Sequence, residues 1–272
     1  MIGLGLTEAG LSSSSSKSLH DLLDILHKCY ELISINKTLK CTNPNNRICI
    51  INTDNVPFNG NKITSLLKEI VEQREGLDVD FITFLNNNVV SLNSMVDRIT
   101  SQRPSNSMIP KCEPVPVKAL VLEDIGYNLP KSLYQKSIKT TYGVVIRNKE
   151  NELNIDIELK LRVANGTHTA LAHTMALSHI LTTELLSSNN NTAELLMKYI
   201  DSFFYNQILP GCCSINDNKD EIIYVYNDWR KRLCHSSFGL STFFITQNGT
   251  AKAGIRIAPT IRSLIQDSNQ VS

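Results

Sequence analysis

Short apolar runs alternate with stretches of helical periodicity in the first half of this chain, and that alternation restricts the folds open to it. The apolar runs predict buried strands at 2–7, 47–55 and 78–86. Between them, apolar residues recur at helical spacing from Leu19 and from Ile63. Strands that alternate with helices predict a parallel, doubly wound sheet, and ligands of such sheets bind beyond the carboxyl ends of the strands.

The second half of the chain lacks this alternation. Two further strands are predicted at 117–124 and 142–148, and beyond them the apolar spacing is helical only. One long apolar helix is predicted over 160–185. We therefore expect an α/β half followed by an all-α half.

The composition excludes several classes of protein. The 272 residues carry 27 basic and 26 acidic side chains, a formal charge of +1 that argues against binding to nucleic acid. No apolar run approaches the roughly 20 residues that span a bilayer, and no signal-peptide pattern opens the chain. Seven cysteines without a CxxC pair suit reduced thiols. We expect a cytoplasmic protein that binds neither membrane nor nucleic acid.

The predicted helix over 160–185 is apolar but carries Lys160, Asn165 and His168. At about 100° per residue, Asn165 falls about 140° and His168 about 80° from Lys160, so all three lie on one side. Buried charged or amide groups are costly unless paired, and an amine, an amide and an imidazole together can form a proton-transfer site. The alternatives are a surface lysine whose stem lies along the helix, and a core histidine with a satisfied ring.

Three further polar residues are candidates for a site. Asn55 follows a predicted buried strand, where it could bind a ligand or shape a turn. Asp97 could act in a site, cap a helix or pair with Arg98. Arg232 lies among other basic residues, for which a solvated face is the default.

Two common kinds of site do not fit the sequence. Gly3 and Gly5 look like the start of a dinucleotide-binding loop, but Glu8 stands where the third glycine should be. The three histidines of the long predicted helix are separated by five and six residues, so they do not form an i, i+4 pair of metal ligands. We expect no metal site.

Five elements follow one another along nearly the whole chain: INTDNVPFNG, LNSMVDRIT, VLEDIGY, KLRVANGTH and NGTAKAGIRIAPTIR. They resemble the long-chain mannitol dehydrogenase family, which includes fructuronate and tagaturonate reductases and mannitol-1-phosphate dehydrogenase. The family patterns N-S-M-V-D-R-I and K-x-R-x-x-N-x-x-H match completely at 93–99 and 160–168. The pattern S/T-x-D-N-x-P-x-N-G matches 53–60 without the extra residue before the aspartate.

The resemblance implies an α/β plus all-α protein. A partial Rossmann-like, parallel-sheet domain for dinucleotide binding would occupy about 1–150, a partial helical substrate domain 151–272, and the active site would lie between them. The implied activity is a metal-independent oxidoreductase that uses NAD or NADP to interconvert a mannitol-like sugar alcohol and a ketose.

The resemblance also implies roles for the polar residues of the motifs. Lys160 would be the general base that takes the proton of the alcohol. Asn55 and Asn165 would hold the developing alkoxide, and His168 would orient the reacting oxygen.

Asp97 and Arg232 would bind the remaining hydroxyls of the sugar. An Arg232 paired with another cation could instead hold a carboxylate, which leaves hexuronate reduction as an alternative. The family element Arg-Phe-x-Asn-Pro is replaced by Arg-Leu-Cys-His-Ser at 232–236, and Ile157 stands where some relatives have a glutamate.

The family's first strand and its Gly-rich phosphate loop would lie before residue 1, and its helical domain would continue beyond residue 272. We therefore expect a chain truncated at both ends. It would be either an incomplete sequence of a working enzyme or a shortened, non-catalytic remnant that folds only with a partner chain or not at all. The residues that bind the cofactor are not identified by the sequence.

Overall fold

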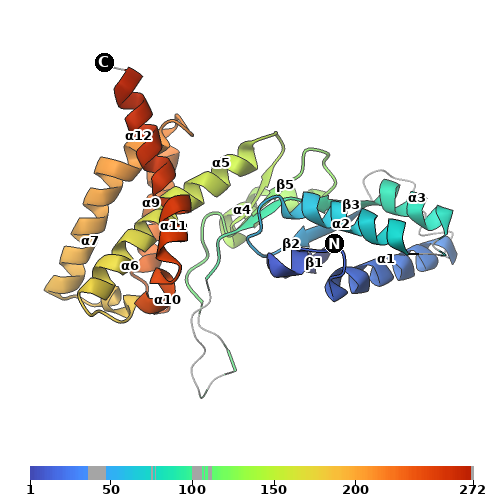
Figure 1. Ribbon diagram of the computed structural model, residues 1–272, viewed down its shortest axis with the longest axis horizontal. Coiled ribbons are helices and arrows are strands. Elements are labelled where there is room, and N and C mark those ends of the chain that lie inside the picture. The colour runs from blue at the N-terminus through green and yellow to red at the C-terminus, as the bar shows by residue number, and fades with distance from the viewer. Residues whose placement is uncertain are drawn as a thin grey trace. The chain divides into compact units, whose positions relative to one another are not determined.

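The structure, a computed structural model, describes residues 1–35, 47–74, 76, 78–99, 106, 108, 109 and 112–270 (Figure 1). The chain divides into two compact units. The first contains 1–96 and 118–153, and the second contains 97–117 and 154–272. The segment 97–117 therefore groups with the helical half of the chain, whereas the sequence-based boundary assigned it to the first domain.

The first unit contains a three-stranded parallel sheet, as the alternating pattern predicted. Its strands are β1 (Ile2–Leu4), β2 (Ile48–Asn52) and β3 (Val89–Leu92), in the order β1-β2-β3. Every residue of β2 after its first is buried. A central strand that is buried on both faces is usual in parallel sheets, which are covered on each side.

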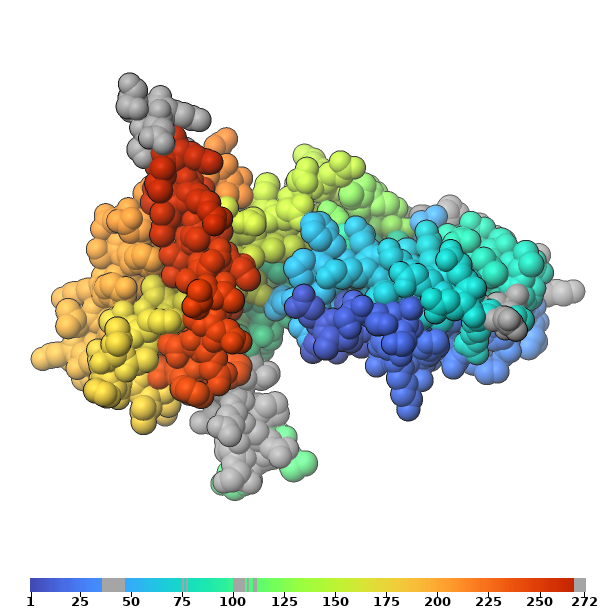
Figure 2. Space-filling view, viewed as in Figure 1, coloured from blue at the N-terminus to red at the C-terminus, as the bar shows by residue number. Residues whose placement is uncertain are grey.

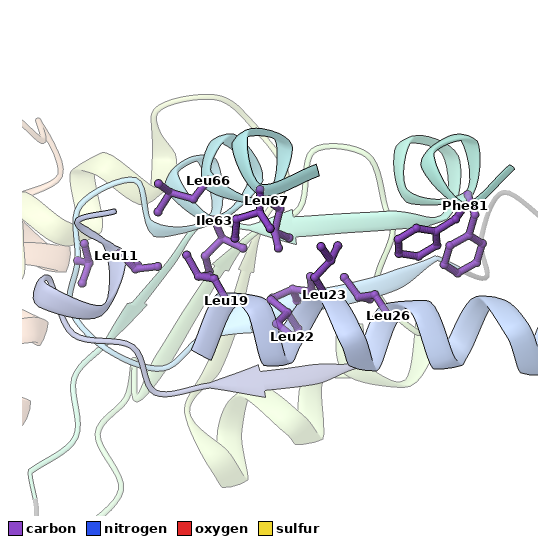
Figure 3. Packing of buried hydrophobic residues seen from close by; sticks show 13 residues of the cluster. Leu11, Leu19, Leu22, Leu23, Leu26, Ile63, Leu66, Leu67 and Phe81 are labelled. Carbon is purple, nitrogen blue, oxygen red and sulfur yellow. The ribbon is translucent and has the colours of Figure 1, made fainter. Parts of the chain in front are cut away.

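Helices cover the face of the sheet to which Ile50 points. They are the 3₁₀ turn η1 (Ala9–Leu11), α1 (Lys17–Ile35), α2 (Asn59–Gln73) and α3 (Val79–Asn88). The leucines of α1 point toward the apolar side chains of α2, with the first phenylalanine of α3 beyond them (Figure 3). Full burial of one leucine contributes about 1.5–3 kcal/mol, so this helical layer supplies much of the unit's stability.

The prediction of a strand over 78–86 is wrong, because this stretch forms α3. The side chain of Asp78 caps the helix by accepting a hydrogen bond from the main-chain N–H of Asp80. Phe81 and Phe84, three residues apart, are both buried against the helical core. Burial of these two rings favours helical spacing over the alternating pattern, and the strand begins only at Val89.

A second, mixed sheet packs against the opposite face of β2. It consists of β4 (Ser94–Val96), β5 (Leu120–Glu123) and β6 (Val144–Arg147), with β4 antiparallel and β6 parallel to β5. The two later predicted strands are thus confirmed. A 3₁₀ turn, η3 (Lys131–Tyr134), and the helix α4 (Lys136–Tyr142) connect β5 to β6.

Asp124 fixes the turn that follows β5. Its fully buried carboxylate accepts hydrogen bonds from the main-chain N–H groups of Asn128 and Leu129, at 2.9 and 2.8 Å, and from the hydroxyl of Tyr134 at 2.5 Å. Burial by itself would raise the pKa of this carboxyl, but the hydrogen bonds outweigh burial and the pKa lies below its usual 3.8.

We expect Asp124→Asn to lower the free energy of unfolding of the chain by about 2–3 kcal/mol, because buried donors lose a charged acceptor. The depressed folded pKa means that the wild-type contribution is present above about pH 4 and is lost as the pH falls through the folded value. Urea denaturation at several acidic pH values measures both effects. Asp24→Asn, at an exposed ion pair, is the control, and an equal loss in both variants would contradict the assignment.

The second unit is helical throughout its described elements and has two apolar cores. Its elements, in chain order, are α5 (Glu152–Leu159), the π-helix η4 (Lys160–Gly166), α6 (Thr167–Leu177), the 3₁₀ turn η5 (Thr183–Ser187), α7 (Asn191–Phe203), the π-helix η6 (Phe204–Ile208), α8 (Leu209–Cys212), α9 (Lys219–Leu233), α10 (Thr242–Thr246), α11 (Gly249–Arg256) and α12 (Ala258–Gln270). None of the helices in the described ranges is long and apolar enough to cross a membrane.

The predicted single helix over 160–185 is wrong in two respects. Its first seven residues form a π-helix, and α6 ends at Leu177. His179 takes a left-handed φ of 56°, which ends the helix. The carbonyl of Ile180 then accepts a hydrogen bond from the Thr242 hydroxyl at 2.8 Å. The apolar residues that follow pack as a turn against the segment before α10 and do not continue the helix.

Candidate active site

Lys160 and Asn165 lie on the same π-helix, η4, at its first and sixth positions. Both side chains are half-buried, and the Asn165 amide makes no hydrogen bond to a described residue. Residues five apart are about 140° apart in an α-helix. In a π-helix each hydrogen bond joins residues five apart, so the turn is wider and residues five apart lie closer to the same face. The widened turn therefore brings amine and amide closer to one face than the α-helical prediction did.

The end of the π-helix packs closely against α11. A Cβ added to Gly166 would lie 3.0 Å from the main-chain oxygen of Arg256, so only glycine permits this approach without a shift. The hydroxyl of Thr167 donates to the carbonyls of Val163 and Ala164, at 2.5 and 3.1 Å. These bonds satisfy carbonyls at the junction where the π-turn changes to α6.

His168 lies in an aromatic enclosure on α6. Its side chain is 6% exposed, and its ring contacts Trp229 and Phe238 at centroid distances of 5.2 and 5.6 Å. Burial, together with the charges of Arg256 and Lys252, lowers the pKa of His168 to about 3. The imidazole is therefore neutral near pH 7, and its Nε2 has no hydrogen-bond partner among the described residues.

Arg232 is buried, with 3% of the residue exposed, so the expectation of a solvated face is wrong. Its guanidinium donates to Asp97 through Nη2 at 2.6 Å, to both oxygens of Glu113 through Nη1 at 3.2 Å, and to Asp228 through Nε at 3.1 Å. Asp97 thus pairs with Arg232 and not with its neighbour Arg98. Burial raises the pKa of Glu113 and of Asp228, although Arg232 opposes the rise.

Trp229 joins the arginine cluster to the histidine. The guanidinium carbon of Arg232 lies 5.1 Å from the centre of the Trp229 ring, and that ring contacts His168. Asp97, Arg232, Trp229 and His168 therefore form one continuous chain of contacts within the second unit. Three predicted site residues are brought together in this way, through a tryptophan that the sequence analysis did not single out.

Sequence reasoning missed three residues of this cluster. Trp229 and Asp228 precede Arg232 by three and four residues on α9, so helical spacing could have identified them as its neighbours. Glu113 lies 119 residues from Arg232 in the chain and has no local signal.

Asn55 belongs to the first unit, whereas the other five predicted site residues belong to the second. It is exposed beyond the carboxyl end of β2. Its side-chain oxygen accepts a hydrogen bond from the Val96 N–H at 3.2 Å, and its own N–H donates to Asp54 at 2.7 Å. The oxygen is thus engaged, and the Nδ2 group is the side of the amide that can donate to a ligand.

The turn after β1 does not fit a dinucleotide phosphate. The N–H of Leu6 donates to the side-chain oxygen of Asn52 at 2.9 Å, and the carbonyl of Leu6 accepts from its amide at 3.0 Å. The next element is the short turn η1, and α1 begins only at Lys17, so no helix N-terminus follows the turn directly, as it does where such folds hold pyrophosphate. In the part of the chain that the structure describes, no three His, Cys, Asp or Glu side chains are grouped to hold a metal ion.

We expect Arg232→Met to lower the free energy of unfolding by about 3–5 kcal/mol, since it leaves three carboxylates without their shared cation. Because the pKa values of Glu113 and Asp228 are raised, these two carboxylates become protonated and neutral at mildly acidic pH. The loss of unfolding free energy should therefore be smaller near pH 5 than near pH 8. Urea denaturation at both pH values measures it. Arg74→Met, at an exposed pair with Asp24, is the control, and a pH-independent loss would contradict the charge argument.

We expect the His168 imidazole to remain neutral down to about pH 4, because its folded pKa is about 3 against 6.5 in the unfolded chain. The unfolded state then binds a proton that the folded state does not, so the free energy of unfolding falls as the pH drops below 6.5. Nitrogen chemical shifts of the ring measure the charge. His168→Gln provides the assignment, and protonation of His168 near pH 6 would contradict the burial argument.

The fold is similar to two solved structures. The crystal structure of D-sorbitol dehydrogenase in substrate-free form aligns with a TM-score of 0.61 at 16% identity, over 96% of this chain and 51% of that chain. The Pseudomonas fluorescens mannitol 2-dehydrogenase ternary complex with NAD and D-mannitol aligns with a TM-score of 0.57 at 18% identity, over 98% of this chain and 56% of that chain.

No model of a known protein family matches the chain, and no curated protein matches it. The chain spans about half the length of the solved structures that it resembles. It has the α/β plus helical fold of these polyol dehydrogenases.

Proposed function

We propose that the chain carries the substrate-binding and proton-transfer residues of an NAD(P)-dependent polyol dehydrogenase. Such an enzyme interconverts a mannitol-like sugar alcohol and a ketose. The main support is one observation: an amine and an amide, Lys160 and Asn165, lie five residues apart on a π-helix that leads directly into the helix of His168. The likeness to two polyol dehydrogenases, one of them in complex with NAD and D-mannitol, supports the same class.

Lys160 is the proposed general base, whose Nζ takes the hydroxyl proton of the alcohol. A lysine titrates near 10.4 in water and is a poor base at neutral pH. Burial disfavours the charged form of an amine, so a half-buried position suits a lysine with this task. A nicotinamide cofactor, NAD or NADP, would supply the hydride acceptor, and the chemistry requires no metal.

Asn165 and His168 are proposed to stabilise the oxygen that loses its proton. An amide N–H aimed at a developing oxyanion is worth about 3–4 kcal/mol in comparable sites. Because His168 is neutral, it can donate one hydrogen bond without competing with Lys160 for the proton. Asn55 keeps its predicted role as a second amide donor from the sequence resemblance alone.

Asp97 is proposed to bind a substrate hydroxyl, and Arg232 to hold Asp97 in place. Four of the five N–H groups of a guanidinium are enough for the contacts that Arg232 makes with three carboxylates. A substrate carboxylate would add a fourth negative group to this cluster. The arrangement therefore favours an uncharged polyol over a hexuronate.

A second candidate is a non-catalytic protein. The observation that favours it is the turn after β1, where the Leu6 N–H is bonded to Asn52 and is not open to a phosphate. Calorimetric titration of the whole chain with NAD and with NADP separates the candidates. Saturable binding supports the dehydrogenase, and no binding of either nucleotide supports the non-catalytic alternative.

We expect Lys160→Ala to lower kcat for mannitol oxidation by at least about a hundredfold, because the transition state loses its proton acceptor. Formation of reduced nicotinamide measures the rate, and circular dichroism verifies the fold. Lys198→Ala, which removes a surface lysine paired with Glu194, is the matched control and should leave kcat unchanged. A Lys160→Ala variant that retains more than about a tenth of the wild-type kcat would rule out the base assignment.

A further inference from the structure

Arg162 occupies the third position of the π-helix, between Lys160 and Asn165, and its side chain is 12% exposed. Its Nε donates to Glu158 on α5 at 2.9 Å. Its Nη1 donates to the Ser263 hydroxyl on α12 at 3.2 Å and lies 3.5 Å from the Gly211 carbonyl on α8. One guanidinium thus connects the π-helix to three other elements.

These contacts differ from those of an ordinary surface ion pair. An exposed i, i+4 pair contributes about 0.3–0.5 kcal/mol and fixes little. Arg162 is largely buried, and two of its three partners lie 49 and 101 residues away in the chain. Contacts of that kind determine where a helix turn sits relative to its neighbours, beyond stabilising the helix itself.

Two of the elements that Arg162 joins, α8 and α12, approach each other at a glycine. A Cβ at Gly211 would lie 2.4 Å from the Thr260 methyl group and 2.8 Å from the Thr260 carbonyl, so α8 and α12 are in direct contact. Gly166 makes the corresponding approach to α11. In Figure 2, α11 and α12 form a continuous band on the visible face of the second unit. This band contacts the π-helix and α8.

A π-helix needs such external contacts. It is rare, and an uninterrupted α-helix is the usual state of a helical segment. Relaxation of η4 to an α-helix would rotate Asn165 away from Lys160, since residues five apart then differ by about 140°. Whatever holds the wide turn also holds the two side chains together.

We propose that Arg162 is a positioning residue of the proposed reaction. It touches neither the substrate nor the reacting atoms. It holds the π-turn that places Lys160 and Asn165 on one face, by fixing that turn between α5, α8 and α12. This assignment rests on the proposed function for its catalytic consequence, but the effect on the π-turn is independent of that function.

The forked guanidinium is essential to this role. A lysine at position 162 could still pair with Glu158, but a single ammonium does not reproduce a planar fork that reaches α5, α8 and α12 at once. Arg162→Lys should therefore restore only part of what Arg162→Gln loses.

The test compares Arg162→Gln and Arg162→Lys in the whole chain with Arg230→Gln. Arg230 is the matched control, because it forms a two-bonded ion pair with Asp201 in the same unit, and this pair joins α9 to α7. Amide hydrogen exchange is followed for residues 160–167 and for α7. We expect Arg162→Gln to accelerate exchange in 160–167 at least about tenfold, with α7 unchanged, and Arg230→Gln to leave 160–167 unchanged.

The second readout is kinetic. We expect Arg162→Gln to lower kcat for mannitol at least about tenfold with little change in KM, because misplacement of the base affects the transition state more than substrate binding. Arg162→Lys should fall between the wild type and Arg162→Gln. Arg230→Gln should keep the wild-type kcat.

Two results would overturn the proposal. One is wild-type exchange over 160–167 in Arg162→Gln. The other is a loss of protection spread over the whole unit and equal to that in Arg230→Gln, which would indicate a general structural role. A wild-type chain without dehydrogenase activity would refute the proposed function alone, since the exchange comparison would still decide the role of Arg162. Should Arg162→Gln fail to fold, Arg162→Lys provides the same comparison.

Discussion

The second unit depends on one local distortion, the π-helix from Lys160 to Gly166. Its inner face packs on a second π-helix, since Val163 belongs to the same apolar core as Phe204 and Ile208 of η6. The Phe204 ring stacks on Tyr226 at 3.7 Å. The side chains of two π-helices in contact are spaced differently from those of two α-helices, so the core between η4 and η6 is packed for the π-helical geometry. The π-helix is thus supported by the packed core as well as by the contacts of Arg162, and in the proposed function it brings Lys160 and Asn165 toward one face.

A second constraint is electrostatic. Arg232 gathers three carboxylates into a buried cluster, and clusters of this kind contribute little net stability but tolerate few alternative arrangements. The cluster fixes Asp97 relative to α9 through a 2.6 Å bond. It also ties the segment 97–117 to the helical unit through Glu113, which in addition accepts the Ile99 N–H at 2.8 Å. The grouping of that segment with the second unit therefore has a charge-based cause.

Some of these features follow from the sequence and others do not. The helix around Leu19 and the strand around Ile50 were predictable, because apolar spacing alone identifies a buried face. The stretch of Phe81 and Phe84 was not, since its alternation fits a strand and only packing against α1 and the rest of the core selects a helix. At the candidate site, Lys160, Asn165 and His168 are visible from their spacing and from the motif that they form. The π-turn has no local signature in those residues, and Glu113 reaches Arg232 only through the folded chain.

Two of the four buried polar side-chain atoms without a partner in the described chain lie in adjoining rings, at His168 Nε2 and Trp229 Nε1. Each such atom costs about 1–3 kcal/mol, and a sequence under selection for stability alone could replace either ring with an apolar side chain. Trp229 contacts Arg232, and His168 follows Asn165 by about one helix turn. The two unpartnered atoms therefore belong to residues at or beside the candidate site. Identities of 16 and 18% to the two similar structures mean that most aligned residues differ. Apolar cores tolerate such exchange when volume and pattern are kept. Packing does not explain a buried imidazole whose Nε2 has no partner in the described chain, and the proposed role of His168 in binding the substrate oxygen accounts for it.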